Sequence, residues 1–113
     1  MYGTILDASS SNIPTTFSTA AGSKIISSAP SASFIGFINT TTDVLAVEIG
    51  SYKDTSVPSS DLPGKCGFIP SAPTGGYGSG TIDWFKVTQG DSVFIRATGG
   101  SAISSGKLYF FFK

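Results

Sequence analysis

Residues 33–49 read SFIGFINTTTDVLAVEI and contain two apolar runs joined by a polar segment. The first run, residues 33–39, is apolar on both faces, as expected of a strand that is covered on both sides. Residues 39–43 are rich in Asn, Thr and Asp, which favour turns. In residues 44–49, Leu45, Val47 and Ile49 share one face. We therefore expect the two runs to pair as a β-hairpin.

Two further regions show the same alternation. Residues 82–87 and 92–97 are predicted strands, and the turn at residues 88–91 favours their pairing as a second hairpin. Residues 107–112 form the last predicted strand, with Leu108, Phe110 and Phe112 on one face and Tyr109 and Phe111 on the other. An exposed edge strand of this composition would aggregate, so it must be central in a sheet or covered by a neighbouring subunit.

The whole pattern predicts an all-β fold. Weaker strand candidates lie at residues 4–6, 15–18, 24–27 and 67–69, and no stretch shows a helical apolar face of ten or more residues. About seven to nine short strands indicate a single antiparallel β-sandwich over residues 1–113, with the jelly roll among the topologies left open. Residues 1–22 are a candidate extended N-terminal arm. Residues 57–80, with four prolines and many glycines, are predicted to be a long loop of the kind that makes contacts.

The composition argues against catalysis. The chain contains no histidine, the side chain that titrates between pH 5 and 8 and the commonest metal ligand. Its acidic residues are scattered, Ser104–Lys107 lacks the spacing of a phosphate loop, and no segment has the acid density of a calcium site. The single cysteine, Cys66, has no partner for an internal disulfide; a small half-buried thiol, a reactive thiol and an intermolecular disulfide remain open. We expect no enzyme, no cofactor and no metal.

The low content of charged residues favours a protein partner. Only 12% of the residues are charged and the net charge is zero, against about 25% charged residues in a typical soluble domain. A sparsely charged surface favours contact with copies of the chain or with another protein, and dispersed lysines do not suit nucleic acid. No apolar run is long enough for a membrane span or a secretion signal, which predicts synthesis and folding in a cytoplasm.

Residues 35–41 and 44–50 contain an apolar strand, an Asn-Thr turn, a Val-rich strand and a glycine, in this order. This order resembles a hairpin found in small structural proteins of tailed bacteriophage virions. Residues 87–95 are similar to the Gly-Asp-Ser/Thr-Val strand opening of those proteins, and residues 105–108 with the closing apolar strand are also similar. The resemblance covers residues 33–113, although the segment 57–80 has no counterpart. It implies a β-sandwich that assembles symmetrically and acts by binding.

The functional hypothesis is a non-enzymatic virion protein, assembled in the host cytoplasm: a capsid decoration (cement) subunit that binds and stabilises the shell. Its expected partners are copies of itself, with a trimer favoured, and the major capsid protein or another virion protein. The alternatives are a tail, baseplate or fibre subunit, and a carbohydrate-binding module in which Tyr77 and Trp84 stack on sugars, although Trp84 also suits a core or interface position. The candidate contact residues are Tyr2, Ile5, Tyr52, Phe68, Ile69, Tyr77 and Trp84.

Overall fold

The computed structural model describes residues 3–7, 13–18, 23–31, 34–51, 66–71, 82–100, 103 and 105–113. Within these ranges the chain forms strands and no helix, which confirms the predicted all-β class. None of these residues forms a helix long and apolar enough to cross a lipid bilayer. The eight strands are β1 (Gly3–Asp7), β2 (Lys24–Ile26), β3 (Phe34–Asn39), β4 (Leu45–Gly50), β5 (Cys66–Ile69), β6 (Asp83–Lys86), β7 (Ser92–Ala97) and β8 (Lys107–Phe112).

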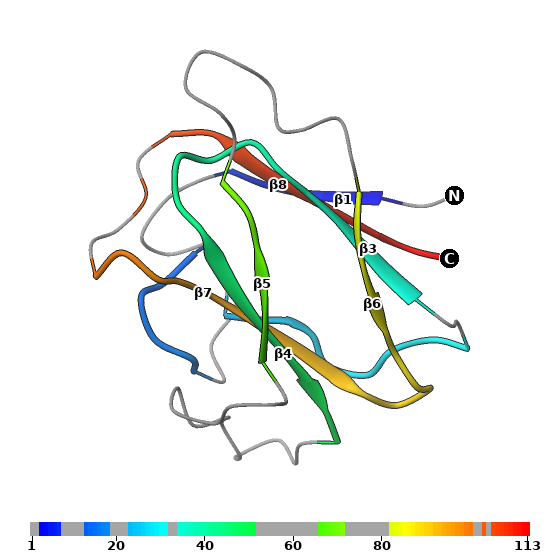
Figure 1. Cartoon of the computed structure of the whole chain (residues 1–113). Coiled ribbons are helices and arrows are strands. Elements are labelled where there is room, and N and C mark those ends of the chain that lie inside the picture. Colours follow the sequence, from blue (N-terminus) through cyan, green and yellow to red (C-terminus); the bar gives the residue numbers. More distant parts are fainter. Residues whose placement is uncertain are drawn as a thin grey trace.

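The strands make two antiparallel sheets that face each other (Figure 1). Sheet A has the order β1-β8-β3-β6 and sheet B the order β2-β7-β4-β5. β1 pairs with β8, β2 with β7, β3 with β6 and β4 with β5, so the first half of the chain pairs with the second half in reverse order. This is the pairing of one long hairpin that is rolled up until β8 meets β3 and β7 meets β4, which makes the sandwich a jelly roll.

Both predicted hairpins are wrong. β3 lies in sheet A and β4 in sheet B, and the same separation applies to β6 and β7. The segment after β3 is a corner between the sheets, and the side chain of Asn39 holds it. Its Nδ2 donates to the carbonyl oxygens of Asp43 (2.9 Å) and Pro70 (3.0 Å), and its Oδ1 accepts from Thr41 N (2.9 Å) and Thr41 Oγ1 (2.6 Å).

The turn between β6 and β7 also carries the chain from one sheet to the other. Gly90 adopts a φ of 90°, a conformation that favours glycine. The backbone amide of Thr88 donates to Asp91 Oδ2 (2.9 Å). The amide of Gly90 donates to the carbonyl oxygen of Ala29, and the amide of Ala29 donates to the carbonyl oxygen of Asp91. These bonds tie the turn to the segment after β2, so the chain enters sheet B beside β2 and not beside β6.

The last strand is central in its sheet, which is one of the two alternatives that the sequence left open. β8 lies between β1 and β3, and its Leu108 and Phe110 are buried in the core while Phe112 packs against it. The other buried residues of this core are Ile35, Phe37, Leu45, Val47, Ile69, Val93, Ile95 and Ala97 in the strands, and Ile13, Ala29, Val87 and Ile103 outside them. The core therefore fills the space between the two sheets, and alternate residues of each strand point outward.

The two irregular segments predicted from composition contain ordered strands. Within residues 1–22, β1 pairs along its length with β8, so this part is an edge strand of the sandwich and not an extended arm. Within residues 57–80, β5 pairs with β4, as the weaker strand candidate at residues 67–69 suggested. Residues 57–65 and 72–80 of the predicted loop lie outside the described residues.

Candidate binding face

The outer surface of sheet A is apolar and aromatic. Leu6, Phe37, Phe85 and Phe110, one on each strand of sheet A, point into the core. The residues that alternate with them along each strand therefore point outward. Strand register places these outward residues in rows across the sheet: Ile5, Tyr109 and Ile38 in one row, and Phe111, Gly36 and Trp84 in the next. We call this surface the aromatic face, and its side chains are Ile5, Phe34, Ile38, Ile82, Trp84, Tyr109 and Phe111.

Trp84 rests across the centre of this face. A Cβ atom at Gly36 would lie 2.7 Å from Cζ3 of Trp84, so the missing side chain of Gly36 makes room for the indole. The ring of Phe111 meets the indole edge-on, with centroids 5.4 Å apart and an interplanar angle of 88°. Lys113 Nζ lies over the indole, 5.0 Å from its centroid. This ring face is therefore occupied, which does not suit the stacking on a sugar that a carbohydrate-binding module needs.

Much of the aromatic face is open to solvent. Ile5 is 55% exposed, Phe34 40%, and Ile82 and Trp84 36% each. A large aromatic side chain offers about 150–250 Å², so these four residues expose on the order of 300–400 Å² of apolar surface. A patch of this size is comparable to the largest patch on a typical monomer, and such patches are often functional. It is about half of what one partner contributes to a standard protein–protein interface.

The charges of this face lie at its two ends. At one end, Lys107 forms an ion pair with Asp7, and the hydrogen bond to this carboxylate raises the pKa of Lys107 above its usual value. At the other end, Lys86 pairs in register with Phe34, and Lys113 exchanges two backbone hydrogen bonds with Phe34 (3.2 and 2.8 Å). Phe34 is therefore flanked by a lysine on each side.

The outer surface of sheet B, by contrast, is largely buried along β4 and β7, although Phe68 of β5 is 60% exposed on it. Phe17 lies over the buried part, and its segment is held by a bond from Ala97 N to the carbonyl oxygen of Pro14 (2.8 Å). Phe17, Ala46 and Phe94 form a second small core there, in which the two rings meet edge-on at 6.4 Å. Glu48, which the sequence pattern places on the outer face of this sheet, is fully buried. Among the described residues, the two sheets therefore differ: Phe17 packs over part of the outer surface of sheet B, whereas several large apolar side chains of sheet A remain exposed.

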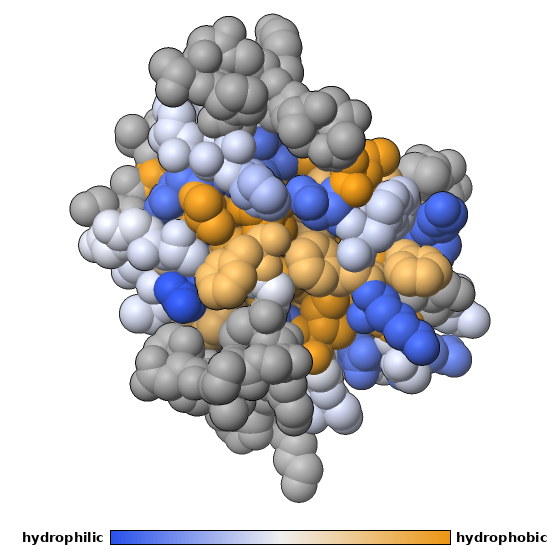
Figure 2. Space-filling view, viewed as in Figure 1, coloured by the Kyte–Doolittle hydropathy of each residue, from blue (hydrophilic) through white to orange (hydrophobic). Residues whose placement is uncertain are grey.

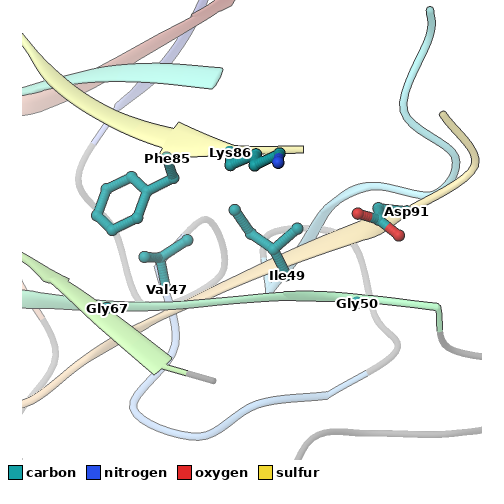
Figure 3. Close-up of a pocket in the computed structure, with 7 residues that line it drawn as sticks. All are labelled: Val47, Ile49, Gly50, Gly67, Phe85, Lys86 and Asp91. Atoms are coloured by element: carbon teal, nitrogen blue, oxygen red, sulfur yellow. The ribbon is translucent and has the colours of Figure 1, made fainter. Parts of the chain in front are cut away.

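A groove of about 390 Å³ opens between the sheets at the edge formed by β5 and β6. Apolar side chains form a band across the middle of the surface in this region (Figure 2). Val47 and Ile49 of β4 point toward Phe85 of β6, and Lys86 and Asp91 lie at one end (Figure 3). The Asp91 carboxylate already accepts the bond from Thr88, so the groove is an open edge of the core and lacks a set of converging polar groups.

The structure brings together two of the candidate contact residues. Ile5 and Trp84 both lie on the aromatic face, on the two outermost strands of sheet A, about 14 Å apart at the usual strand spacing. Phe68 is 60% exposed but belongs to β5 in the other sheet. Ile69 was wrongly expected at a contact: it is fully buried, because inward-facing positions alternate with outward-facing ones and Phe68 takes the outward one. Tyr2, Tyr52 and Tyr77 lie outside the described residues.

Sequence reasoning missed three aromatic residues of this face. Phe34, Phe111 and Tyr109 were recognised as strand residues, but the neighbours that place them beside Trp84 come from pairings far apart in the chain. The available signal was the apolar character of both faces of residues 34–38 and 108–112. Only one of those faces can point into the core of a two-layer sandwich.

Among the described residues, no three His, Cys, Asp or Glu side chains cluster closely enough to hold a metal ion. No protein-family model, curated protein or solved structure matches this chain. The function must therefore be inferred from the fold and from the aromatic face.

Proposed function

We propose that this protein is a non-enzymatic structural component of a tailed-phage virion, a capsid decoration subunit that binds the assembled shell through its aromatic face. One observation carries the proposal: Ile5, Phe34, Ile82 and Trp84 leave a broad apolar area exposed on the outer surface of sheet A, whereas Phe17 packs over the buried side chains of Ala46 and Phe94 on the outer surface of sheet B. A jelly roll with one uncovered aromatic sheet is built to pack against another surface.

The fold and the composition support a binding role. Jelly rolls are frequent among viral capsid domains, and the sequence resembles small virion proteins over residues 33–113. The absence of histidine from the whole sequence removes the usual acid–base and nucleophile arrangements. A subunit that binds the assembled shell more tightly than its separate parts stabilises the shell by mass action. Binding alone is then sufficient for the function.

The proposal is tested on particles of the phage whose genome encodes this sequence. We expect the protein in purified virions, and we expect shells assembled without it to release their DNA at a lower temperature. Adding back the purified protein should restore the release temperature, whereas the Trp84→Ala variant should not. Thr16→Ala, an exposed change on the side of sheet B, is the matched control and should restore it fully.

Two results would contradict this function. If purified virions lack the protein, it is not a virion component. If labelled protein is found on the tail, baseplate or fibres and never on the shell, a tail-associated subunit replaces the decoration subunit.

A further inference from the structure

The outward-facing side chains of sheet A have a positive net charge, although the net charge of the whole chain is zero. Three lysines (Lys86, Lys107 and Lys113) and one aspartate (Asp7) point to this side, a side-chain net charge of +2. Asp7 and Lys107 neutralise each other. The excess positive charge therefore belongs to Lys86 and Lys113, on either side of Phe34.

These two lysines border the part of the aromatic face formed by Phe34 and Trp84, which are 40% and 36% exposed. Their strands lie on either side of β3, so the two side chains start about 10 Å apart at the usual strand spacing. Lys113 reaches over the indole of Trp84, and Lys86 forms no ion pair with any described residue. A surface that packs on Phe34 and Trp84 must therefore come close to both ammonium groups.

We propose that the partner surface is apolar at its centre and carries carboxylates where it meets Lys86 and Lys113. This inference rests on the proposed function and names the chemistry of the shell site that the aromatic face would recognise. Burial of a lysine without an opposite charge costs free energy, so a partner without acids here would bind weakly. Opposite charges also orient the partner, because the other end of the face is already neutral.

The charges disfavour a second copy and a nucleic acid as the occupant. Two copies can pack symmetrically through this face in two orientations. In one orientation, Lys86 and Lys113 meet the same lysines of the other copy. In the other, with the second copy turned end to end, they meet its neutral Lys107–Asp7 ion pair. Nucleic acid is held mainly by many phosphate contacts, and two lysines around an apolar centre supply few.

The test measures binding of the purified protein to shells stripped of it, across a range of salt concentrations. We expect Lys86→Gln to weaken binding about 3- to 10-fold at low ionic strength, and Lys86→Glu to weaken it further. The difference from wild type should shrink toward 1 M salt, where the Debye length is about 3 Å. Thr16→Glu is the matched control: it changes the net charge by the same one unit as Lys86→Gln, on the side of sheet B, and should leave binding unchanged.

The outcomes separate this inference from the function on which it rests. Suppose that the wild-type protein binds shells, that Trp84→Ala abolishes this binding, and that neither salt nor Lys86→Glu affects it. The proposed carboxylates on the partner surface are then wrong, and the decoration function stands. If wild type does not bind the shells at all, both are wrong. If the lysine effect appears with phage DNA and not with emptied shells, a polyanion replaces the acidic protein surface.

Discussion

Gly36 lies in the middle of sheet A, where an ordinary strand residue would carry a side chain. A methyl group there would come within 2.8 Å of Ile82 Cγ2 and closer still to the indole of Trp84. We expect Gly36→Ala to destabilise the fold by about 1–3 kcal/mol, the usual cost of overpacking, and to shift the fluorescence of Trp84, the only tryptophan in the chain. Urea unfolding and emission spectra measure both. In a Trp84→Ala background the same change should cost less, because only the contact with Ile82 remains; an equal cost in both backgrounds would contradict the contact with the indole.

Asn39 is buried and satisfies backbone groups from three parts of the corner after β3. Removing its amide leaves those groups without this partner, and each buried unsatisfied group costs about 1–3 kcal/mol. We expect Asn39→Ala to lower the free energy of unfolding by about 2–4 kcal/mol, as measured by urea denaturation. Thr42→Ala, an exposed change in the same corner, should have little effect. Equal stability of the two variants would show that the amide does not hold the corner.

Burial raises the pKa of Asp83 above its usual value of 3.8. A carboxyl whose pKa is higher in the folded state favours folding while it is protonated, and this contribution is lost as the pH rises through the folded pKa. We therefore expect Asp83→Asn to be more stable than wild type at pH 7 and equal to it at pH 3. Thermal unfolding at a series of pH values gives the difference. A variant that is less stable at pH 7 would show that the carboxylate makes a favourable interaction there.

At the scale of the strands, β8 holds sheet A together because it pairs with β1 on one side and β3 on the other. We expect a chain that ends at residue 106 to remain unfolded, since it loses both ladders and the core side chains Leu108 and Phe110. Circular dichroism and amide proton dispersion report the outcome. Phe110→Ala, which removes one ring and keeps the strand, should fold with a loss of about 3–5 kcal/mol. A folded, soluble truncated chain would contradict the central role of β8.

Sequence periodicity predicted most strands, and the apolar faces of β8 required it to be either central in a sheet or covered by a neighbouring subunit. Strand partners were not predictable in the same way. Residues 34–39 and 45–50 are neighbours in sequence, and a short polar connection is equally compatible with a hairpin and with a corner between sheets. The choice depends on the bonds of Asn39 to Pro70 and Asp43, and the position of Pro70 beside this corner is set by β5. No local pattern contains that information.

The candidate site was predictable only in part, for the same reason. Ile5 and Trp84 are predicted contact residues because both are expected to be exposed, but 79 positions separate them in the chain. They share a face because β8 and β3 lie between their strands. The burial of Ile69 and the exposure of Phe34 likewise depend on which face of each strand meets the opposite sheet.

For the whole molecule, the sparse charge and the exposed Phe68 on sheet B predict self-assembly. We expect native mass spectrometry of the purified protein to show a trimer. The exposed side chain of Phe68 lies on sheet B, away from the aromatic face, so Phe68→Ser should reduce the trimer while Trp84→Ala leaves it intact. A monomer at all concentrations would contradict symmetric assembly, and a hexamer or dodecamer would favour a tail or connector ring.

The pairing of β1 with β8 also constrains how the protein can be made. The Asp7–Lys107 contact joins residues 100 positions apart, and the first strand has no other partner in its sheet. While the ribosome is still translating the earlier strands, sheet A lacks its central strand, and the aromatic residues of sheet A lack their packing partners on β8. Folding must therefore wait until β8 has left the exit tunnel, and chaperones that shield apolar segments would have the longest access to this chain before that moment.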